Sequence, residues 1–314
     1  MKNKVALYGA GNVGATTAHW LAQMEIADLV LFDIFGQIGA GKALDLFESG
    51  PPMGFDSLIY GSNDASIIEG ADVVVVTAGV PRKKDPVTGK FPSRDELVKI
   101  NQDVMEVVAE NVKTYAPDSI VVLVTNPLDA MAHVMLHKTG FDPRRVIGQA
   151  GALDTARYKT FIAADLGVSV EDVHGIVLGG HGDTMVPLPR LTSVAGIPVT
   201  ELISQERLDE IIERTRQGGG EIVGLLGYSG YYAPAAGTAI MVESILKDKK
   251  RVIPSAVYTQ GEYGYRDLFI GLPTVLGRDG VERIIEFELT DEERAMLDHS
   301  ADAVRSVVAV LGYD

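Results

Sequence analysis

The start of the chain contains a glycine-rich turn that few folds can accommodate. An apolar stretch at 5–8 leads directly into a G-x-G-x-x-G run at 9–14, a helical pattern continues to Glu25, and a second apolar stretch at 29–32 ends in Asp33. The three glycines of such a run allow a tight turn, a close approach of backbone to a pyrophosphate, and close packing of a helix on a strand. The pattern therefore predicts a strand, a turn, a helix and a second strand that together bind a dinucleotide.

The acidic residue at the end of the second apolar stretch indicates which dinucleotide binds. Asp33 follows Gly14 by 19 positions, where a carboxylate can hold the 2′-hydroxyl of a ribose. It would repel a 2′-phosphate, which favours NAD over NADP. The N-terminus of the helix offers free N–H groups and a positive dipole end to the phosphates. We expect Gly9, Gly11, Gly14 and Asp33 to contact NAD, although a flavin or another nucleotide on the same fold, or a turn that binds nothing, would fit the run alone.

Apolar stretches and helical patterns alternate through the first half of the chain. The continuous apolar runs at 72–78 and 119–124 are typical of strands buried on both faces of a parallel sheet. Helical patterns at 37–49, 94–115 and 129–138 separate the expected strands. The alternation predicts an α/β fold with an N-terminal Rossmann-type, doubly wound parallel sheet in residues 1–149, and ligands at the carboxyl ends of its strands.

The second half of the chain has a different pattern, which predicts a C-terminal α+β substrate domain in residues 150–314. Helices are expected at 154–166, 208–226, 232–246 and from Thr290 to about Leu311, and strands at 173–178, 252–258, 268–272 and 284–287. The acidic residues after Thr290 are typical of a helix start.

Composition excludes several classes of function. The chain carries a net charge of −15 and contains no cysteine. A strongly acidic protein is a poor partner for nucleic acid or an anionic membrane, and disulfides, thiolate zinc sites and cysteine nucleophiles are impossible. No metal site is expected. The N-terminus leaves no room for a signal peptide before the first strand, and no apolar run is long enough to cross a bilayer, so we expect a soluble, cytoplasmic protein.

One of the six histidines stands out by its surroundings. His181 lies at a predicted strand end between Gly180 and Gly182, with Asp183 next. Flanking glycines leave the imidazole uncovered, and a group that titrates near neutrality suits the removal of a hydroxyl proton during hydride transfer. A carboxylate would have to orient it. The alternative is a tight loop in which the histidine only ends a strand.

Two charged residues open the helix predicted at 154–166. Asp154 and Arg157 lie three positions apart, on one face. They can form an ordinary surface pair, or Asp154 can orient His181 while Arg157 binds a substrate carboxylate through two parallel hydrogen bonds. The residues alone leave both interpretations open. Asn126, at the end of a predicted strand, can likewise cap a turn or reach the ligand.

The stretch 79–94 is long, basic and rich in Pro and Gly, and it follows a core strand. This position predicts a mobile lid over the binding crevice, with a solvated surface loop as the alternative.

These segments together resemble the lactate/malate dehydrogenase family over essentially the whole length. The runs 9–14 with Asp33, 125–129, 153–157 and 179–183 occur in the family's order. The resemblance implies an enzyme that transfers hydride between a 2-hydroxy acid and NAD, and a homodimer or homotetramer.

The resemblance also implies a role for each site residue. His181 would be the acid/base with Asp154 as its carboxylate partner, and Arg157 would bind the C1 carboxylate. Arg94 would polarise the reacting carbonyl from the lid, and Asn126 would contact the substrate near the nicotinamide. Further cofactor contacts implied in this way are Asn12, Val13, Asn101 and Asn126.

Three features resemble the lactate-dehydrogenase-like branch of malate dehydrogenases, and imply malate and oxaloacetate as substrates in a reaction of the tricarboxylic acid cycle. Arg82 occupies the position where malate enzymes carry Arg and lactate enzymes usually Gln. A second substrate carboxylate in a closed site needs such a counter-charge. The run 179–188 looks like the malate version, and Gly230 stands where lactate enzymes tend to carry Thr.

One departure leaves alternatives open. Arg82 and Arg94 are 12 positions apart, whereas the usual malate pattern spaces them by six, so the lid gains about six residues near 84–89. Some protist lactate dehydrogenases with an extended lid select pyruvate through an inserted aromatic, and Phe91, Lys84 or Lys90 could intrude here in a similar way. Pyruvate/lactate or a relaxed 2-keto acid specificity is therefore the alternative substrate class.

The fold can also serve a different class of protein, such as a non-catalytic NAD-binding redox sensor or an NAD-using glycosidase. Glycosidases of that type generally need a metal site with Cys, which is absent. A non-catalytic relative would be expected to lose part of the set His181, Asp154, Arg157 and Arg94, and all four are present.

Overall fold

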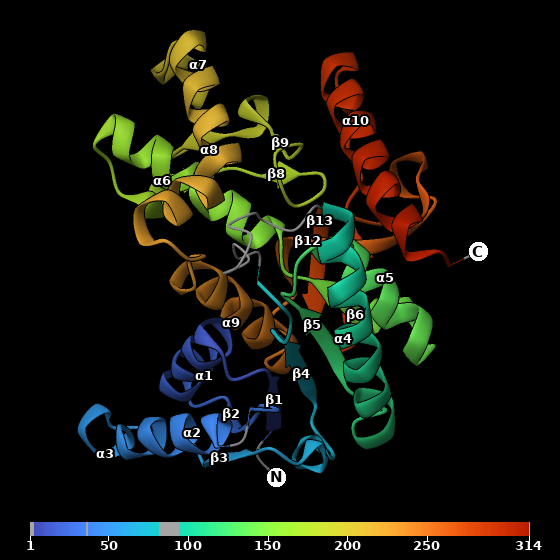
Figure 1. Cartoon of the computed structure of the whole chain (residues 1–314). Helices are drawn as coiled ribbons and strands as arrows, with labels where there is room; N and C mark the ends of the chain where they lie inside the picture. Colours follow the sequence, from blue (N-terminus) through green and yellow to red (C-terminus); the bar gives the residue numbers. More distant parts are fainter. Residues whose placement is uncertain (1–2, 36, 82–93, 314) are drawn as a thin grey trace.

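A nine-stranded sheet runs through the computed structural model, which describes residues 3–35, 37–81 and 94–313 apart from the side chain of Arg94 (Figure 1). Six parallel strands have the order β3-β2-β1-β4-β5-β6, and three antiparallel strands, β12, β13 and β14, continue the sheet beyond β6. The parallel strands are β1 (Asn3–Tyr8), β2 (Ala27–Phe32), β3 (Ile59–Ser62), β4 (Val73–Val76), β5 (Ile120–Leu123) and β6 (Val146–Gly148). The expected Rossmann-type, doubly wound sheet is confirmed.

Alternate residues of the parallel strands enter two different hydrophobic cores. Val73 and Val75 pack with one core, whereas Val74 and Val76 pack with the other. Successive side chains of a strand point to opposite faces, and helices cover both faces, so every one of these positions is buried. This two-sided burial is why the strands are continuous apolar runs in the sequence.

Helices cover the two faces of the sheet. Figure 1 shows α1, α2 and α9 on one side and α4, α5 and α10 on the other. The helices of the N-terminal half are α1 (Asn12–Met24), α2 (Ile38–Glu48), α3 (Gly50–Met53), α4 (Arg94–Tyr115) and α5 (Leu128–Thr139). Those of the C-terminal half are α6 (Gly151–Leu166), α7 (Val199–Leu202), α8 (Gln205–Leu226), α9 (Tyr232–Leu246) and α10 (Asp291–Val308).

The strand order reverses between β1 and β4, and this switch point positions the glycine-rich turn. The crossovers after β1 and after β4 lie on opposite faces of the sheet, and ligands of such folds bind at the carboxyl ends of the two strands. The turn at 9–14 follows β1, and Thr77 and Gly79 follow β4 at the same edge. The turn that we predict to bind the dinucleotide therefore lies at the carboxyl ends of the parallel strands, at the switch point.

The C-terminal half joins this sheet and also builds small sheets of its own. Strands β12 (Arg251–Gln260), β13 (Arg266–Gly277) and β14 (Gly280–Ile284) form an antiparallel meander, and Ala256 of β12 pairs with Gly148 of β6. The remaining strands are short: β7 (Val173–His174), β8 (Val177–Leu178), β9 (Val186–Pro187), β10 (Ser193–Val194) and β11 (Ile197–Pro198). The domain boundary between 149 and 150 stays a prediction.

The strands expected at 252–258 and 268–272 form within the longer β12 and β13, whereas two other expected strands differ in kind. The strand expected at 173–178 is divided into β7, which pairs with β10, and β8, which pairs with β9. Gly175 lies in the gap, where an added Cβ would be 3.1 Å from the Thr192 side chain, so the chain changes sheet where the backbone packs closely. The strand expected at 284–287 lies instead at Gly280–Ile284 and shares only Ile284 with the prediction, because β14 follows β13 through a tight turn after Gly277 and then leaves the sheet.

Candidate active site

The glycine-rich turn after β1 is shaped by backbone contacts. Gly9 has a φ of +109°, and a Cβ there would be 2.7 Å from the backbone nitrogen of Ala78. A Cβ on Gly14 would be 1.9 Å from the carbonyl oxygen of Gly9. Gly11, by contrast, has no atom within 4 Å of such a Cβ. Two glycines therefore allow the turn to pack, and the third leaves the backbone open to a ligand.

The carboxylate expected at the ribose is fixed to this turn. Asp33 Oδ2 accepts a hydrogen bond from the Ala10 N–H at 2.9 Å, and Oδ1 accepts one from the Phe35 N–H at 3.0 Å. Helix α1 begins at Asn12, and the Gly11 before it provides no side-chain cap, so the first N–H groups of the helix remain for a phosphate. The donors and acceptor of this turn fit an NAD molecule.

The imidazole and the carboxylate predicted to work together are in contact. Asp154 lies in the first turn of α6, is 2% exposed, and its Oδ2 lies 3.0 Å from His181 Nδ1. An Nδ1–H donated to Asp154 leaves Nε2 to exchange a proton. Burial and the charge of Arg157 disfavour the imidazolium. The charge and hydrogen bond of Asp154, together with the charge of Asp129, outweigh them and raise the pKa of His181 above its ordinary value.

The arginine of the same helix is buried beside this pair. Arg157 Nη1 lies 3.5 Å from Asp154 Oδ1, and its buried Nε has no partner among the described residues. Burial lowers the pKa of Arg157 from its ordinary value, and the charge of Asp154 opposes that shift. Because an unpaired buried donor is costly, the Arg157 guanidinium is suited to an anionic ligand that completes its hydrogen bonds.

Helix α8 approaches this guanidinium through a run of three glycines. A Cβ on Gly218 would be 3.1 Å from Arg157 Cδ and 3.3 Å from its Nε, and one on Gly219 would be 3.7 Å from Nη2. Gly220 has no such neighbour. The missing side chains let the backbone of α8 lie directly against Arg157.

Asn101 joins the segments that contain Asn126 and Val80 through side-chain hydrogen bonds to their backbone. The buried Asn101 amide donates to the Asn126 carbonyl at 2.7 Å and to the Val80 carbonyl at 3.1 Å, and its Oδ1 accepts from the Val80 N–H at 2.7 Å. Asn126 is exposed and precedes Pro127. Asn101 therefore braces the chain segments after β4 and β5, while the predicted contacts of both residues with ligand remain predictions.

Several predicted site residues are not tested by these contacts. Arg82 and most of the predicted lid at 79–94 lie outside the described residues, as does the side chain of Arg94. Asn12 and Val13 begin α1 beside the turn. A Cβ on Gly230 would be 3.2 Å from Ile222, so the small residue there makes room for a side chain of α8.

The site contains groups to which the sequence analysis assigned no role. Asp129, in the first turn of α5, accepts the backbone N–H of His181 through Oδ2 at 3.1 Å. Ser300, in α10, accepts the Gly180 N–H at 2.9 Å. An acid directly after Asn126-Pro127-Leu128 was a visible signal, as were three glycines inside a helical pattern. Nothing around Ser300 in the sequence marks it.

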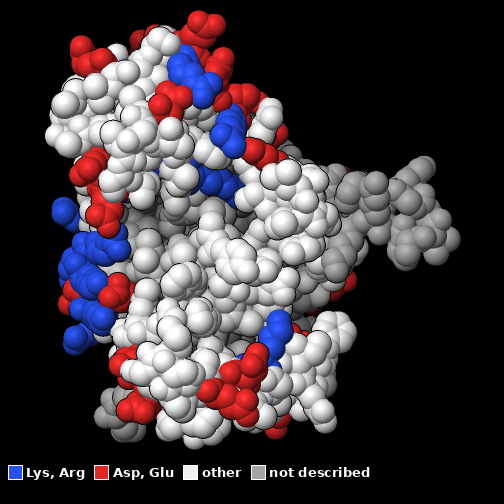
Figure 2. Space-filling view, turned by 90° about the vertical axis from the view of Figure 1, so that its left-hand side faces the viewer, with Lys and Arg blue, Asp and Glu red and all other residues white. Residues whose placement is uncertain are grey.

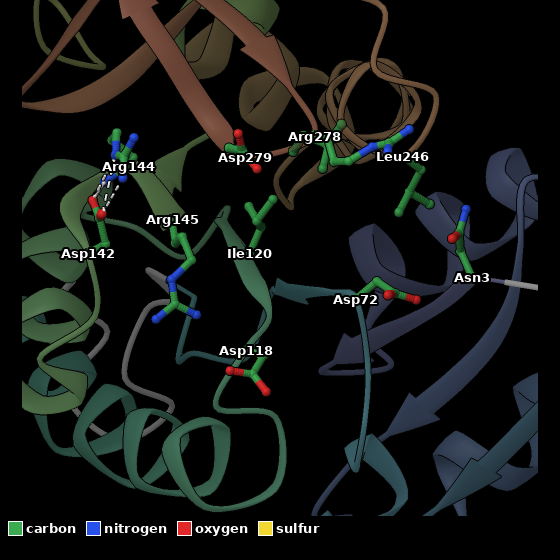
Figure 3. Close-up of a pocket in the computed structure, with 11 residues that line it drawn as sticks. Asn3, Asp72, Asp118, Ile120, Asp142, Arg144, Arg145, Leu246, Arg278 and Asp279 are labelled. Carbon is green, nitrogen blue, oxygen red and sulfur yellow. Dashed lines mark hydrogen bonds and ion pairs between the residues drawn. The ribbon is translucent and has the colours of Figure 1, made fainter.

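A separate cavity of about 770 Å³ lies at the opposite edge of the sheet (Figure 3). Asn3 and Ile120, which begin β1 and β5, line it, so it opens at the amino ends of the strands. Arg144 pairs with Asp142, and Arg145 donates to the carbonyls of Pro117 and Ser119. No residue of the NAD turn or of the His181 cluster lines this cavity.

The described part of the chain lacks two other kinds of feature. No group of three or more His, Asp or Glu side chains there is arranged to hold a metal ion. None of the helices described is long and apolar enough to cross a membrane.

The doubly wound sheet, the turn with its carboxylate, and the buried histidine–carboxylate pair define an NAD-dependent oxidoreductase. Comparison with known proteins gives the family. The model of the lactate/malate dehydrogenase NAD binding domain matches residues 3–148, and that of the lactate/malate dehydrogenase alpha/beta C-terminal domain matches residues 151–310. The chain belongs to the lactate/malate dehydrogenase family.

Full-length relatives include enzymes named for either substrate. A malate dehydrogenase of Thermomicrobium roseum is 54% identical over 311 residues, which cover 99% of each chain. The solved structure of a malate dehydrogenase of Cryptosporidium parvum is similar with a TM-score of 0.95 at 38% identity, covering 99% of both chains. The lactate dehydrogenase of the same organism, in complex with lactic acid and β-nicotinamide adenine dinucleotide, has a TM-score of 0.94 at 39% identity, covering 100% of this chain and 99% of that one. The backbone alone therefore does not select the substrate.

Proposed function

We propose that the protein is an NAD-dependent malate dehydrogenase that interconverts malate and NAD with oxaloacetate and NADH. The observation that carries the proposal is the buried cluster in which Asp154 lies against both His181 and Arg157. One acid/base and one carboxylate-binding cation are what the oxidation of a 2-hydroxy acid requires. The high identity to a full-length relative named malate dehydrogenase supports the choice of substrate.

In the proposed mechanism His181 moves the proton. Bound NAD supplies the acceptor for the hydride that leaves C2 of malate. Neutral His181 takes the hydroxyl proton as the C–O bond becomes a carbonyl, and Asp154 stabilises the imidazolium that forms. In the opposite direction the imidazolium returns this proton to oxaloacetate, so reduction requires protonated His181 and oxidation requires neutral His181. Because its pKa is raised, His181 keeps its proton to a higher pH than an ordinary imidazole.

Arg157 orients the substrate in this scheme. Its planar guanidinium can hold the C1 carboxylate by two parallel hydrogen bonds, which would give the buried Nε a partner. Asn126 lies at the end of β5 near the crevice, and Arg94 begins α4. We assign to Asn126 a hydrogen bond to substrate and nicotinamide, and to Arg94 the polarisation of the carbonyl.

The choice between malate and lactate depends on Arg82. We propose that Arg82 pairs with the second carboxylate of malate, which pyruvate lacks. The test is kcat/KM with NADH for oxaloacetate and for pyruvate, in the wild type and in Arg82→Gln. The proposal expects the wild type to prefer oxaloacetate and Arg82→Gln to lose most of that preference. A wild type that prefers pyruvate, or full oxaloacetate activity in Arg82→Gln, would show that the assignment is wrong.

A lactate dehydrogenase or a relaxed 2-keto acid reductase is the second candidate. Two observations favour it: the six additional residues between Arg82 and Arg94, and the equally close backbone of a lactate dehydrogenase. The same assay separates the two candidates. A redox-sensing module without turnover would bind NADH and reduce neither acid.

We also propose that the chain forms a homodimer or homotetramer. Apolar side chains are exposed on α2 (Leu44 and Phe47) and where α8 ends and α9 begins (Leu225 and Tyr232). Figure 2 shows few charged side chains in the middle of the face that carries α1, α2 and α9. Exposed apolar areas of this kind often mark interfaces. Light scattering should give the mass of two or four chains, and a monomer would contradict this part of the proposal.

The site of action that we propose is the cytoplasm, and the bacterial origin of the matching malate dehydrogenase supports it.

A further inference from the structure

The loop that carries His181 is held by three consecutive hydrogen bonds to three different elements. The Gly179 N–H donates to the Gly271 carbonyl of β13 at 2.9 Å, and the Gly180 N–H donates to Ser300 Oγ of α10 at 2.9 Å. The His181 N–H donates to Asp129 Oδ2 of α5 at 3.1 Å. Successive backbone groups are thus anchored to three parts of the molecule that are far apart in sequence.

Asp129 differs from the other two anchors because it can carry a charge. A carbonyl and a hydroxyl hold the neighbouring N–H groups, so a neutral acceptor is sufficient for anchoring. Burying a carboxylate is costly unless an opposite charge or several hydrogen bonds compensate it. Asp129 is buried, and its Oδ1 has no hydrogen-bond partner among the described residues. Anchoring alone therefore does not account for an acid at this position.

The groups around Asp129 indicate what its charge interacts with. The small cavity of about 40 Å³ beside it is also lined by His181, Asp183, Thr184 and the apolar side chains of α10, Ala303, Val304 and Val307. A Cβ on Gly180 would be 2.5 Å from Val304 and 3.3 Å from Asp129 Oδ2, so the glycine lets both elements pack on the loop. Asp154 of α6 contributes a second negative charge. Among the described residues lining the cavity, His181 is the group that can become a cation.

We propose that Asp129 is a second positioning residue for His181, which fixes the histidine main chain through Oδ2 and places a negative charge beside the imidazole. Asp154 orients the ring through Nδ1, whereas Asp129 orients the backbone that carries the ring. The two carboxyl groups together favour the imidazolium that the reduction of a keto acid requires. The proposal rests on the acid/base role assigned to His181 in the proposed function.

The titration of Asp129 agrees with this arrangement. Burial raises the pKa of Asp129 to about 6, against the charge and the N–H of His181, which lower it. The negative charge of Asp129 in turn raises the pKa of His181. At and above neutral pH Asp129 is ionised, and its charge keeps the proton on His181 to a higher pH. As the pH falls through about 6, Asp129 takes up a proton and this contribution disappears.

The test is the pH profile of kcat/KM for the reduction of oxaloacetate by NADH, in the wild type and in Asp129→Asn. The amide oxygen of Asn can still accept the His181 N–H, so the variant removes the charge and keeps the anchor. We expect the high-pH limb, where His181 loses its proton, to move to lower pH by about 0.5–1 unit. NADH affinity should stay within about threefold of the wild type. In the malate-oxidation profile, the ascending limb should move in the same direction.

Ser300→Ala is the matched control, because it removes a neutral anchor of the same loop. It should leave the high-pH limb within about 0.2 unit of the wild type, whatever its effect on the rate. A limb in Asp129→Asn that superimposes on the wild type, or an equal shift in Ser300→Ala, would overturn the proposal.

A second measurement needs neither a folded Asp129 variant nor turnover. The ¹⁵N resonances of the His181 ring, assigned with His181→Asn, can be titrated in the wild-type NADH complex. We expect two inflections, one from His181 itself and a lower one near pH 6 from Asp129. A single inflection would contradict the proposal. Because this titration does not depend on the substrate, it can succeed even if the wild type fails to reduce oxaloacetate, which would contradict the proposed function instead.

Discussion

The NAD turn after β1 and the His181 loop after β8 both follow strand ends, but they are built from different materials. Backbone groups and missing side chains make the first, since Gly9 and Gly14 pack directly on neighbouring backbone. Buried ionisable side chains make the second, where Asp154 lies against both His181 and Arg157. At the turn the Asp33 carboxylate already accepts two backbone N–H groups, whereas the Arg157 guanidinium still lacks a partner at Nε.

This difference in construction corresponds to two tasks, cofactor binding at the turn and proton transfer at the His181 loop. The backbone of the turn suits phosphates whatever the substrate, and changes there should act through steric fit and stability. The charged cluster has fewer of its hydrogen bonds satisfied within the protein, because substrate binding offsets the cost of burying these charges. Changes there should therefore act on turnover and substrate affinity. Variants in the two regions should therefore fail in different assays.

The largest effect on stability is expected at the turn. Gly14→Ala places a Cβ 1.9 Å from a backbone oxygen, which no side-chain rotation can relieve. We expect a loss of about 3–5 kcal/mol of stability and at least a roughly 100-fold weaker affinity for NADH, measured by thermal unfolding and fluorescence titration. Gly41→Ala in α2 is the control, because a Cβ there has no neighbour within 4 Å. It should stabilise the helix by about 0.5–1 kcal/mol. Normal NADH binding by Gly14→Ala would contradict the conclusion that close backbone packing at Gly14 shapes the NAD turn.

Arg157→Gln tests the charged cluster. The variant removes the cation proposed to hold the C1 carboxylate, so kcat/KM for oxaloacetate should fall by about 10²–10³-fold, with NADH affinity unchanged. Steady-state kinetics with a parallel NADH titration measures both quantities. Arg214→Gln, which removes an exposed arginine that pairs with Glu221 on α8, should leave both unchanged. Equal losses in NADH and oxaloacetate affinity would mean that the two regions are not separable.

A smaller effect is expected where α8 passes Arg157. A Cβ on Gly218 is 3.1 Å from Arg157 Cδ, so Gly218→Ala should displace the guanidinium and raise KM for oxaloacetate by about three- to tenfold. Gly220→Ala, two residues along the same helix, adds a Cβ with no neighbouring atom within 4 Å. This variant should raise stability by about 1 kcal/mol with KM unchanged. Identical kinetics in the two variants would show that Gly218 does not affect the position of Arg157.

The sequence predicted the regions that depend on local patterns. The apolar runs and the glycine spacing gave the parallel sheet, the NAD turn and Asp33, because each follows from neighbours in the chain. His181, Asp154 and Arg157 were found as candidates, although the residues alone left the last two open until the contacts placed them together. The contact between Asp154 and His181 joins α6 to the loop after β8, and no local sequence pattern reveals that these two elements meet.

The remaining features depend on approaches between distant elements. Ser300 and Asp129 act on the His181 loop from α10 and α5, and the expected strand at 173–178 is divided where its backbone packs on Thr192. Single-sequence patterns contain no information about such approaches, because they depend on how whole elements pack.

The most direct test measures NADH affinity and turnover in one preparation of His181→Asn. We predict a dissociation constant for NADH within about threefold of the wild type, since the turn at 9–14 is untouched, and a kcat for oxaloacetate reduction lower by about 10³-fold or more. Near-normal turnover, or a parallel loss of NADH binding, would contradict the conclusion that backbone groups form the cofactor site and that a separate cluster of charged side chains transfers the proton.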